Sequence, residues 1–282
     1  MPAVDHQFEP MSIGMLLDRA VRLYTQNFPL MLGITAVLNV PIFFLSILPR
    51  LLPFTGYTWV AILSSGLVGF ATLLVVYPLV TGATTKAVSD KYLGNPVTVG
   101  SALKEAWGCV GTLLLTQWVA AIIVGVGFLL LVIPGILWML SYTLIAPVVM
   151  IEASDRRFRQ VYSLTGETKG MATQSMDRGD IRRRSWKLVK GNRGKVFVVL
   201  IVLFLLRALL SSGANWVTAM SFSAGPNVGF AVQSIIGDGI NVLTSPLQTI
   251  AVTLLYYDFR IRKEGFDLEM LSRAMGTSTE NA

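Results

Sequence analysis

The side chains that most often do chemistry are scarce in this chain. Of the 282 residues, one is a histidine, His6, and one is a cysteine, Cys109. A catalytic histidine pair, a cysteine-rich metal site and an internal disulfide each need at least two such residues. Glu152 and Asp155 lie close together, but they fit a helix end that meets water. With no HExxH sequence, nucleophile elbow or phosphate-binding glycine loop, we expect no catalytic, cofactor-binding or metal site, and a protein that is not an enzyme.

A second kind of candidate is a charged side chain inside an apolar segment, because ionisable groups at membrane depth are often functional. Arg207 lies within KVFVVLIVLFLLRALLSSG, and Asp238 lies just before another apolar stretch. We expect the two to form an intramembrane ion pair; the alternative is that Arg207 extends to the surface alone and Asp238 is solvated. Four uncharged polar side chains suit hydrogen bonds between helices better than an ion path: Asn39, Gln117, Asn241 and Gln248.

The elements that position these residues are predicted to cross a membrane. The chain is 53% hydrophobic and 14% charged, whereas soluble domains are roughly 25% charged. Apolar segments of about 20 residues, enough to span a bilayer, separate the charged ones. The stretch between Glu105 and Glu152 is too long for one helix, so we expect a turn at VIPG, residues 132–135. The result is an all-α integral membrane protein with about six transmembrane helices: 28–48, 60–80, 110–132, 136–152, 195–213 and 239–257.

These helices form one membrane domain over residues 11–271, between polar tails at 1–10 and 272–282. Residues 214–238, rich in Gly, Ser and Asn, fit either a loop or a re-entrant or interfacial helix. Of the 23 Lys and Arg residues, all but Arg50 and Arg207 fall on the side that holds both termini. Because positive charge is retained in the cytoplasm, we expect a multi-pass protein of the inner cell membrane with both termini cytoplasmic.

The densest basic region is the cytoplasmic loop 155–195. Basic side chains beside a membrane helix attract anionic lipid headgroups, at about 1 kcal/mol each. We therefore interpret the loop as a membrane-surface basic cluster, with an acidic protein partner as the alternative and no nucleic acid. The cluster comprises Arg182, Arg183, Arg184, Lys187, Lys190, Arg193 and Lys195.

The last apolar stretch leads into LLYYDFRIRKEGFDLEML. Aromatic residues followed by basic ones are typical of a helix leaving the membrane. We interpret five residues as a membrane-exit anchor: Tyr256, Tyr257, Arg260, Arg262 and Lys263. The spacing of Asp258 and Arg262 predicts a helical ion pair, and Gly265 is predicted to end the helix.

A similar segment precedes each pair of passes. DRAVRLYTQNFPLMLGI aligns without gaps on RRSWKLVKGNRGKVFVV, and LKEAWGCVGTLLLTQWV follows the same plan more loosely. In the first copy the apolar residues from Ile13 to Tyr24 share one helical face. We therefore expect three hairpin units, each preceded by an interfacial amphipathic helix.

Several of these segments resemble one known family. SIGMLLDRAVRLYTQNFPLMLGI, IPGILWMLSYTLIAPVVMIE, RRSWKLVKGNRGKV and TLLYYDFRIRKEGFDLE are similar to the membrane-domain family named after glycerophosphoryl diester phosphodiesterase. The resemblance covers roughly residues 12–271 and implies a multi-pass helical domain, which some members fuse to a catalytic domain. This chain departs from the family pattern between Asp155 and Arg182, where it has an extra polar segment.

Three functions follow from these features. The first is a non-enzymatic scaffold or anchor that acts through its cytoplasmic helices and basic loop. The second is a small transporter or channel for a lipid-like or amphipathic solute. The third is a membrane subunit that supports a separate glycerophosphodiester or lipid enzyme. A scaffold predicts a tight, dry bundle core, whereas a transporter requires a polar cavity within the membrane.

Overall fold

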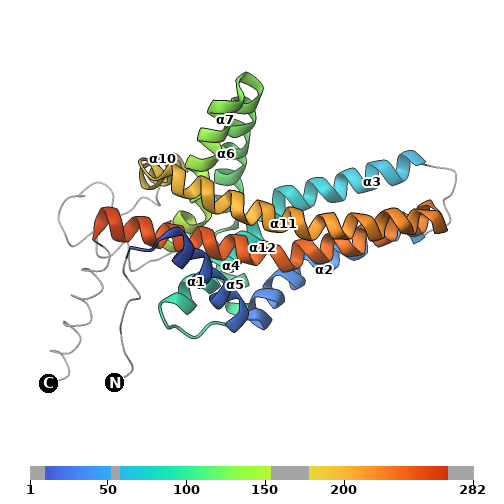
Figure 1. The fold of residues 1–282 in the computed structure, drawn as a ribbon, viewed down its shortest axis with the longest axis horizontal. Helices are drawn as coiled ribbons and strands as arrows, with labels where there is room; N and C mark the ends of the chain where they lie inside the picture. Colours follow the sequence, from blue (N-terminus) through green and yellow to red (C-terminus); the bar gives the residue numbers. More distant parts are fainter. Residues whose placement is uncertain (1–9, 52–57, 154–177, 266–282) are drawn as a thin grey trace.

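The structure is a computed structural model that describes residues 10–51, 58–153 and 178–265. Every regular element in these ranges is helical (Figure 1), so the expected all-α fold is confirmed over the described residues. The first elements are α1 (Ile13–Gln26), α2 (Phe28–Leu51), α3 (Thr58–Ala71), the π-helix η1 (Thr72–Val76), α4 (Tyr77–Tyr92), α5 (Val99–Gly108) and α6 (Val110–Leu130). The remainder are α7 (Val132–Tyr142), α8 (Ile145–Pro147), the π-helix η2 (Val148–Ala153), α10 (Arg178–Val189), α11 (Arg193–Ser221), the 3-10 helix η3 (Phe222–Ala224) and α12 (Pro226–Glu264).

Local sequence signals explain several helix boundaries. The Ser12 side chain accepts a hydrogen bond from a backbone N–H in the first turn of α1, and Thr98 forms a capping box with Ser101 at the start of α5. Between α11 and α12, Gly225 adopts a φ of 122° that favours glycine, and Pro226 then opens α12. The segment 214–238 is thus helical on both sides of a tight turn at Gly225.

α12 is the central element. It runs beside α11, and α1, α2, α4 and α10 also pack against it (Figure 1). Every side chain from Ile250 to Ile261 is buried, including the polar and charged ones. The helix ends at Gly265, whose φ of 60° is left-handed, as the sequence predicts. The part of α12 from Ile250 to Ile261 is therefore enclosed by protein, and the helix becomes exposed again from Arg262 onwards.

Five helical segments are long and apolar enough to cross a membrane: Phe28–Leu45, Gly66–Tyr92, Val110–Leu130, Val132–Glu152 and Arg193–Ala224. The described chain therefore has the helix lengths and composition of a multi-pass membrane protein. The sixth expected pass, 239–257, lies in α12 and is not among the five. Its Gln and Thr side chains make it less apolar. A helix surrounded by other helices has less need of a lipid-facing hydrocarbon surface.

The helix that contains the second expected pass, 60–80, continues beyond that pass. α3, η1 and α4 follow one another without a break as far as Tyr92. The prediction ended the pass before Lys86, on the assumption that this cation meets water. Instead, the Nζ atom of Lys86 lies 3.1 Å from Asp90 and 3.0 Å from Glu105, so its charge is matched within the protein.

The turn expected at 132–135 lies slightly earlier. Leu131 has an extended backbone between α6 and α7, and Pro134 lies in the first turn of α7, where proline is tolerated. The two helices then pack closely: a Cβ atom built on Gly127 would lie 2.6 Å from the Trp138 ring and 3.0 Å from the Cα atom of Gly135. In Figure 1 this pair projects away from the direction that α2, α3, α11 and α12 share.

Candidate functional site

Two groups of buried charges lie at the end of α12. The first, here the Asp258 cluster, surrounds a carboxylate that is fully buried. Asp258 accepts hydrogen bonds from Lys195 at 2.6 Å, from Arg262 at 3.1 Å and from the backbone N–H of Met11 at 2.7 Å. Lys195 and Arg262 also donate to the Met11 carbonyl oxygen, at 2.6 and 2.9 Å. The cluster thus ties the segment before α1 to α11 and α12, and it contains the predicted Asp258–Arg262 pair.

The second group, here the Glu152 cluster, joins η2, α10 and α12. The Arg184 Nε atom donates to both oxygens of Glu152, at 3.1 and 2.9 Å, and its terminal nitrogens bind Glu264. Tyr256 donates its hydroxyl hydrogen to Glu152 at 2.9 Å, and Arg260 donates to the Tyr256 oxygen at 3.3 Å. Each buried polar group in this cluster therefore has a partner of complementary charge or hydrogen-bonding type.

These contacts shift the ionisation of two cluster members. Burial alone would raise the pKa of Glu264, but the hydrogen bonds and charges of Arg184 and Arg260 outweigh it and lower that pKa below its ordinary value. The pKa of Arg184 is also affected by burial, which would lower it, yet its two carboxylate partners raise it overall. Both groups are therefore held in their charged forms.

The membrane-exit anchor is wrong for three of its five residues. Tyr256 and Tyr257 are fully buried, and Arg260 is 3% exposed, so none of them can lie among lipid headgroups. The Tyr257 hydroxyl instead lies 2.7 Å from that of Ser89, and its ring stacks on Tyr92. A tyrosine pair before basic residues is typical of a membrane interface, but here other helices cover the same positions.

The other two anchor residues also bind protein. Arg262 belongs to the Asp258 cluster, and Lys263 donates to the carbonyl oxygens of Lys187 and Lys190 at the end of α10, at 2.7 and 2.5 Å. A cation at this place satisfies carbonyl groups that the last turn of a helix leaves without partners.

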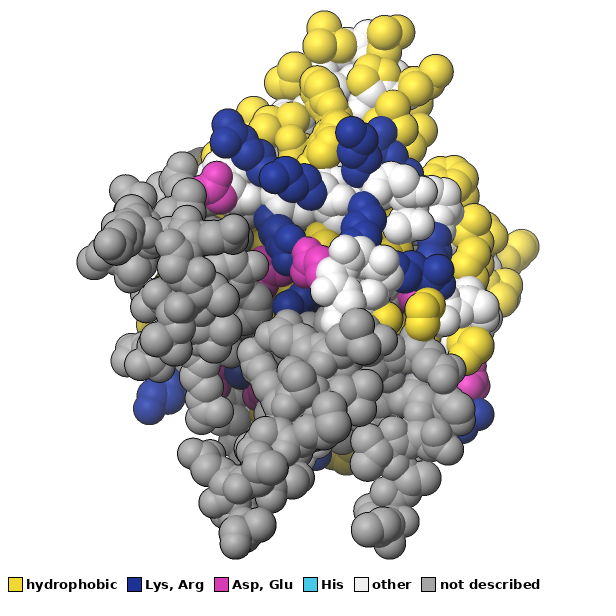
Figure 2. Space-filling model, turned by 90° about the vertical axis from the view of Figure 1, so that its left-hand side faces the viewer, with side chains coloured by type: hydrophobic (Ala, Val, Ile, Leu, Met, Phe, Trp, Pro, Cys, Tyr) yellow, Lys and Arg dark blue, Asp and Glu magenta, His cyan; other side chains and the backbone are white. Residues whose placement is uncertain are grey.

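The membrane-surface basic cluster is divided between two environments. Arg184 and Lys195 face inward to the two buried clusters, and Arg193 lies over the Trp186 ring at 4.6 Å. Figure 2 shows this end of the molecule, where Lys and Arg side chains gather around a few acidic ones below the apolar α6–α7 pair. Residues 154–177 of the basic loop lie outside the described residues. Contact with lipid headgroups stays a prediction for the exposed members, Arg183, Lys187 and Lys190, and for the half-buried Arg182.

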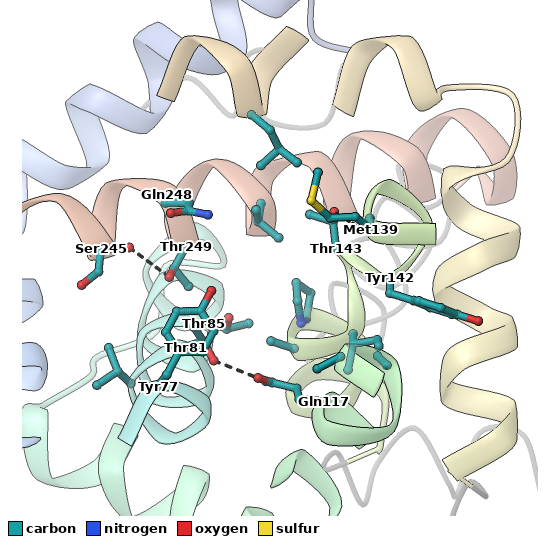
Figure 3. Close-up of a pocket in the computed structure, with 18 of the residues that line it drawn as sticks. Tyr77, Thr81, Thr85, Gln117, Met139, Tyr142, Thr143, Ser245, Gln248 and Thr249 are labelled. Carbon is teal, nitrogen blue, oxygen red and sulfur yellow. Dashed lines mark hydrogen bonds between the residues drawn. The ribbon is translucent and has the colours of Figure 1, made fainter. Parts of the chain in front are cut away.

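A cavity of about 450 Å³ lies between α4, α6, α7, α11 and α12; its wall is largely apolar, and it is here called the polar cavity after the hydroxyl and amide side chains that line part of it. Its volume is within the range of roughly 300–1,000 Å³ that is common for small-molecule sites. Figure 3 shows hydroxyl and amide side chains from several of these helices around it. Its polar lining comes largely from candidate membrane spans and from α12: Asn39, Thr72, Tyr77, Thr81, Thr85, Gln117, Thr143, Arg207, Asn241, Ser245, Gln248 and Thr249.

Several of these polar groups have unused hydrogen-bonding capacity. The Thr85 hydroxyl oxygen is buried and has no hydrogen-bond partner among the described residues. Gln117 donates weakly to Thr81 at 3.4 Å (Figure 3). The side chains of Asn241 and Gln248 make no hydrogen bond to another residue that the structure describes. A buried hydroxyl without a partner costs free energy, so the Thr85 oxygen in particular favours a polar occupant of this cavity.

Arg207 supplies the positive charge of this site. It lines the polar cavity, as Tyr77 on α4 also does. The ion pairs formed between described residues do not include one between Arg207 and Asp238, which is half-buried on α12 and has other interactions. The expected pair stays a prediction. What the sequence did not reveal is that Arg207 and the four separately noted amides line one cavity.

The described residues contain no group of three or more His, Cys, Asp and Glu side chains that could hold a metal ion. No protein-family model matches the chain, and no curated protein or solved structure is significantly similar to it. The resemblance to the phosphodiesterase membrane-domain family therefore stays a prediction, and the function must be argued from the geometry.

Proposed function

We propose that this protein is a small transporter that binds an amphipathic solute within the membrane and moves it across. The observation that supports this proposal is the polar cavity. It lies among helices apolar enough to cross a bilayer, and it contains a cation, hydroxyls and amides. A dry, tightly packed core, as a pure scaffold requires, would leave no such space.

The buried clusters also favour a transporter over a scaffold. A scaffold that acts through basic cytoplasmic helices needs its cations on the surface. Arg184 and Lys195, from the expected basic surface, instead bind carboxylates inside the protein. The third candidate, a membrane subunit of a separate lipid enzyme, has no specific contact in its favour.

The proposed architecture is six passes in three units, each with a leading amphipathic helix. The element order supports it, since α1 precedes α2 and α3, α5 precedes α6 and α7, and α10 precedes α11 and α12. Positions that the sequence alignment matches also share their burial. Each leading helix buries a pair of residues at matching positions, all at most 1% exposed: Leu16 with Ala20, Ala102 with Ala106, and Ile181 with Ser185.

The proposed sixth pass is the middle of α12, and the proposed orientation has both termini in the cytoplasm of an inner membrane. The two charge clusters then lie at the cytoplasmic end, and the α11–α12 turn lies at the far side. The one-sided distribution of Lys and Arg supports this orientation.

A flux assay tests the proposal. The full chain is reconstituted in liposomes that contain a fluorescent single-chain amphiphile in both leaflets, and dithionite added outside destroys the accessible fluorophore. We expect the protein to increase the loss of inner-leaflet fluorescence. The Thr81→Val/Gln117→Leu variant, which removes polar groups from the cavity wall, should slow this loss severalfold.

The matched control is Thr218→Val, which makes the same hydroxyl-to-methyl change on α11 away from the cavity and should leave the rate unchanged. If liposomes with and without the protein lose fluorescence equally fast, the transporter proposal is wrong.

A further inference from the structure

A second cavity adjoins the polar one. It has a volume of about 470 Å³ and lies between α7, α11 and α12. Its wall is mainly hydrocarbon and aromatic, and includes Phe197, Leu203, Phe204, Leu206 and Leu247. An apolar cavity of this size favours a hydrocarbon occupant.

The two cavities share part of their walls. Met139, Leu200, Arg207 and Gln248 line both of them. One occupant can therefore place its polar end among the hydroxyls and amides and its apolar end between α7 and α11. The cation and one of the free amides lie at the junction, where the two halves of such a molecule meet.

The charge at the junction indicates which polar end fits best. Arg207 has a guanidinium group, and it makes no ion pair or hydrogen bond with another described residue. A guanidinium that lines a cavity favours an oxyanion, such as a phosphate or a carboxylate, which it can bind through two parallel hydrogen bonds. Gln248, which lines both cavities with Arg207, can donate a further hydrogen bond to the same group.

We infer that the ligand is an anionic amphiphile whose phosphate or carboxylate binds Arg207 and whose hydrocarbon chain fills the apolar cavity. This inference rests on the proposed function and specifies its substrate class. The same chemistry is found in a bilayer lipid and in a single-chain amphiphile taken from water.

Competition binding tests the inference. The full-length protein, in nanodiscs of zwitterionic lipid, binds a fluorescent dodecanoate, which is displaced by dodecyl phosphate, dodecanol or dodecyltrimethylammonium. We expect dodecyl phosphate to compete about tenfold better than dodecanol, as a charge-assisted contact implies, and the cation to compete worst. Arg207→Gln should remove this preference without weakening the binding of dodecanol, and Arg207→Lys should retain part of it.

The hydrocarbon end has its own test. Leu206→Trp replaces the leucine side chain by a bulkier indole at the apolar cavity. It should reduce severalfold the factor by which dodecyl phosphate competes better than hexyl phosphate. Leu205→Trp is the matched control, because Leu205 is also exposed but does not line the cavity. Arg183→Gln is the matched control for Arg207, since it removes an exposed cation far along the chain.

The outcomes distinguish an error in the ligand class from an error in the proposed function. If dodecanol competes as well as dodecyl phosphate, or if Arg207→Gln still prefers dodecyl phosphate, the inference of an anionic headgroup is wrong. The binding of an amphiphile would still stand. If Leu206→Trp and Leu205→Trp behave alike, the chain does not occupy the apolar cavity. If the fluorescent dodecanoate does not bind at all, the proposed function fails with it. The source of the ligand follows from the lipid that copurifies. If the unmodified protein retains anionic lipid through purification and Arg207→Gln loses it, the ligand comes from the bilayer. If neither protein retains anionic lipid, the ligand is an amphiphile taken from water.

Discussion

The buried carboxylates at the end of α12 differ from surface acids in how many partners they have. Asp258 is held by two cations and a backbone N–H, whereas Asp18 forms an ion pair with Arg22, at 2.9 Å on an exposed helix face. Both acids precede an arginine by four residues, so their sequence context is similar. Only their surroundings differ, and the surroundings determine what each pair contributes to stability.

Asp258→Asn should therefore destabilise the protein by about 3–5 kcal/mol, because it leaves Lys195 and Arg262 partly buried without a counter-charge. Asp18→Asn, the control on the exposed pair, should cost about 0–1 kcal/mol. Melting temperatures of the detergent-solubilised variants, followed by size-exclusion chromatography, would compare them. Equal melting temperatures would contradict a structural role for the Asp258 cluster.

The Glu152 cluster predicts a dependence on pH. Because the pKa of Glu264 is lower in the folded protein than its ordinary value of 4.5, its contribution to stability is fully present above pH 4.5. That contribution is lost as the pH falls through the folded-state pKa. The melting temperature of the unmodified protein should therefore decrease below pH 4.5 more steeply than that of Glu264→Gln. Parallel curves would show that Glu264 does not participate.

At the scale of the elements, the close approach of α6 and α7 depends on a missing side chain. Gly127→Ala would place a methyl group against Trp138 and the backbone of Gly135, and should destabilise the protein by about 1–3 kcal/mol through overpacking. Gly125→Ala lies two residues away with nothing within 4 Å of the new Cβ atom, and should be neutral or slightly stabilising. Melting temperatures of the two variants provide the comparison. Equal losses would mean that the glycines are not needed for packing.

How far the elements can be predicted from sequence depends on whether their environment is lipid or protein. α6 and α11 contact lipid along much of their length in the proposed bilayer arrangement, and long uncharged apolar stretches predicted both. α4 and the end of α12 are covered by other helices, so they contain charges and tyrosines that resemble the end of a membrane pass. A charged residue marks the end of a membrane pass reliably only where its side chain meets water. A single sequence does not reveal that Lys86 has two acidic neighbours.

The sequence predicts the individual polar residues of the candidate site, but it does not predict that they meet around one cavity. The sequence identified Arg207 and the amides Asn39, Gln117, Asn241 and Gln248 because polar groups are rare in such apolar stretches. Their meeting around one cavity depends on how α2, α6, α11 and α12 are rotated about their own axes. Those rotations follow from packing between segments far apart in the sequence, which periodicity within one segment does not determine.

At the scale of the whole molecule, the proposed orientation predicts on which side of the membrane each connecting segment lies. A fluorescent protein that matures only in the cytoplasm should fluoresce when fused after residue 282. Alkaline phosphatase, active only outside the inner membrane, should be active when inserted at 52–57, between α2 and α3. Activity of the phosphatase at the C-terminus would reverse the proposed orientation.

The position of α12 has a consequence for biosynthesis. This helix is made after α1, α2, α4, α10 and α11, yet all five pack against it, and Asp258 binds the backbone of Met11, far earlier in the sequence. These helices leave the ribosome before their main packing surface exists, so the fold can close only once α12 has been made. A chain truncated before α12 would expose Lys195, Arg184 and Glu152 without their partners on that helix, and would be a ready substrate for the proteases that remove unfinished membrane proteins.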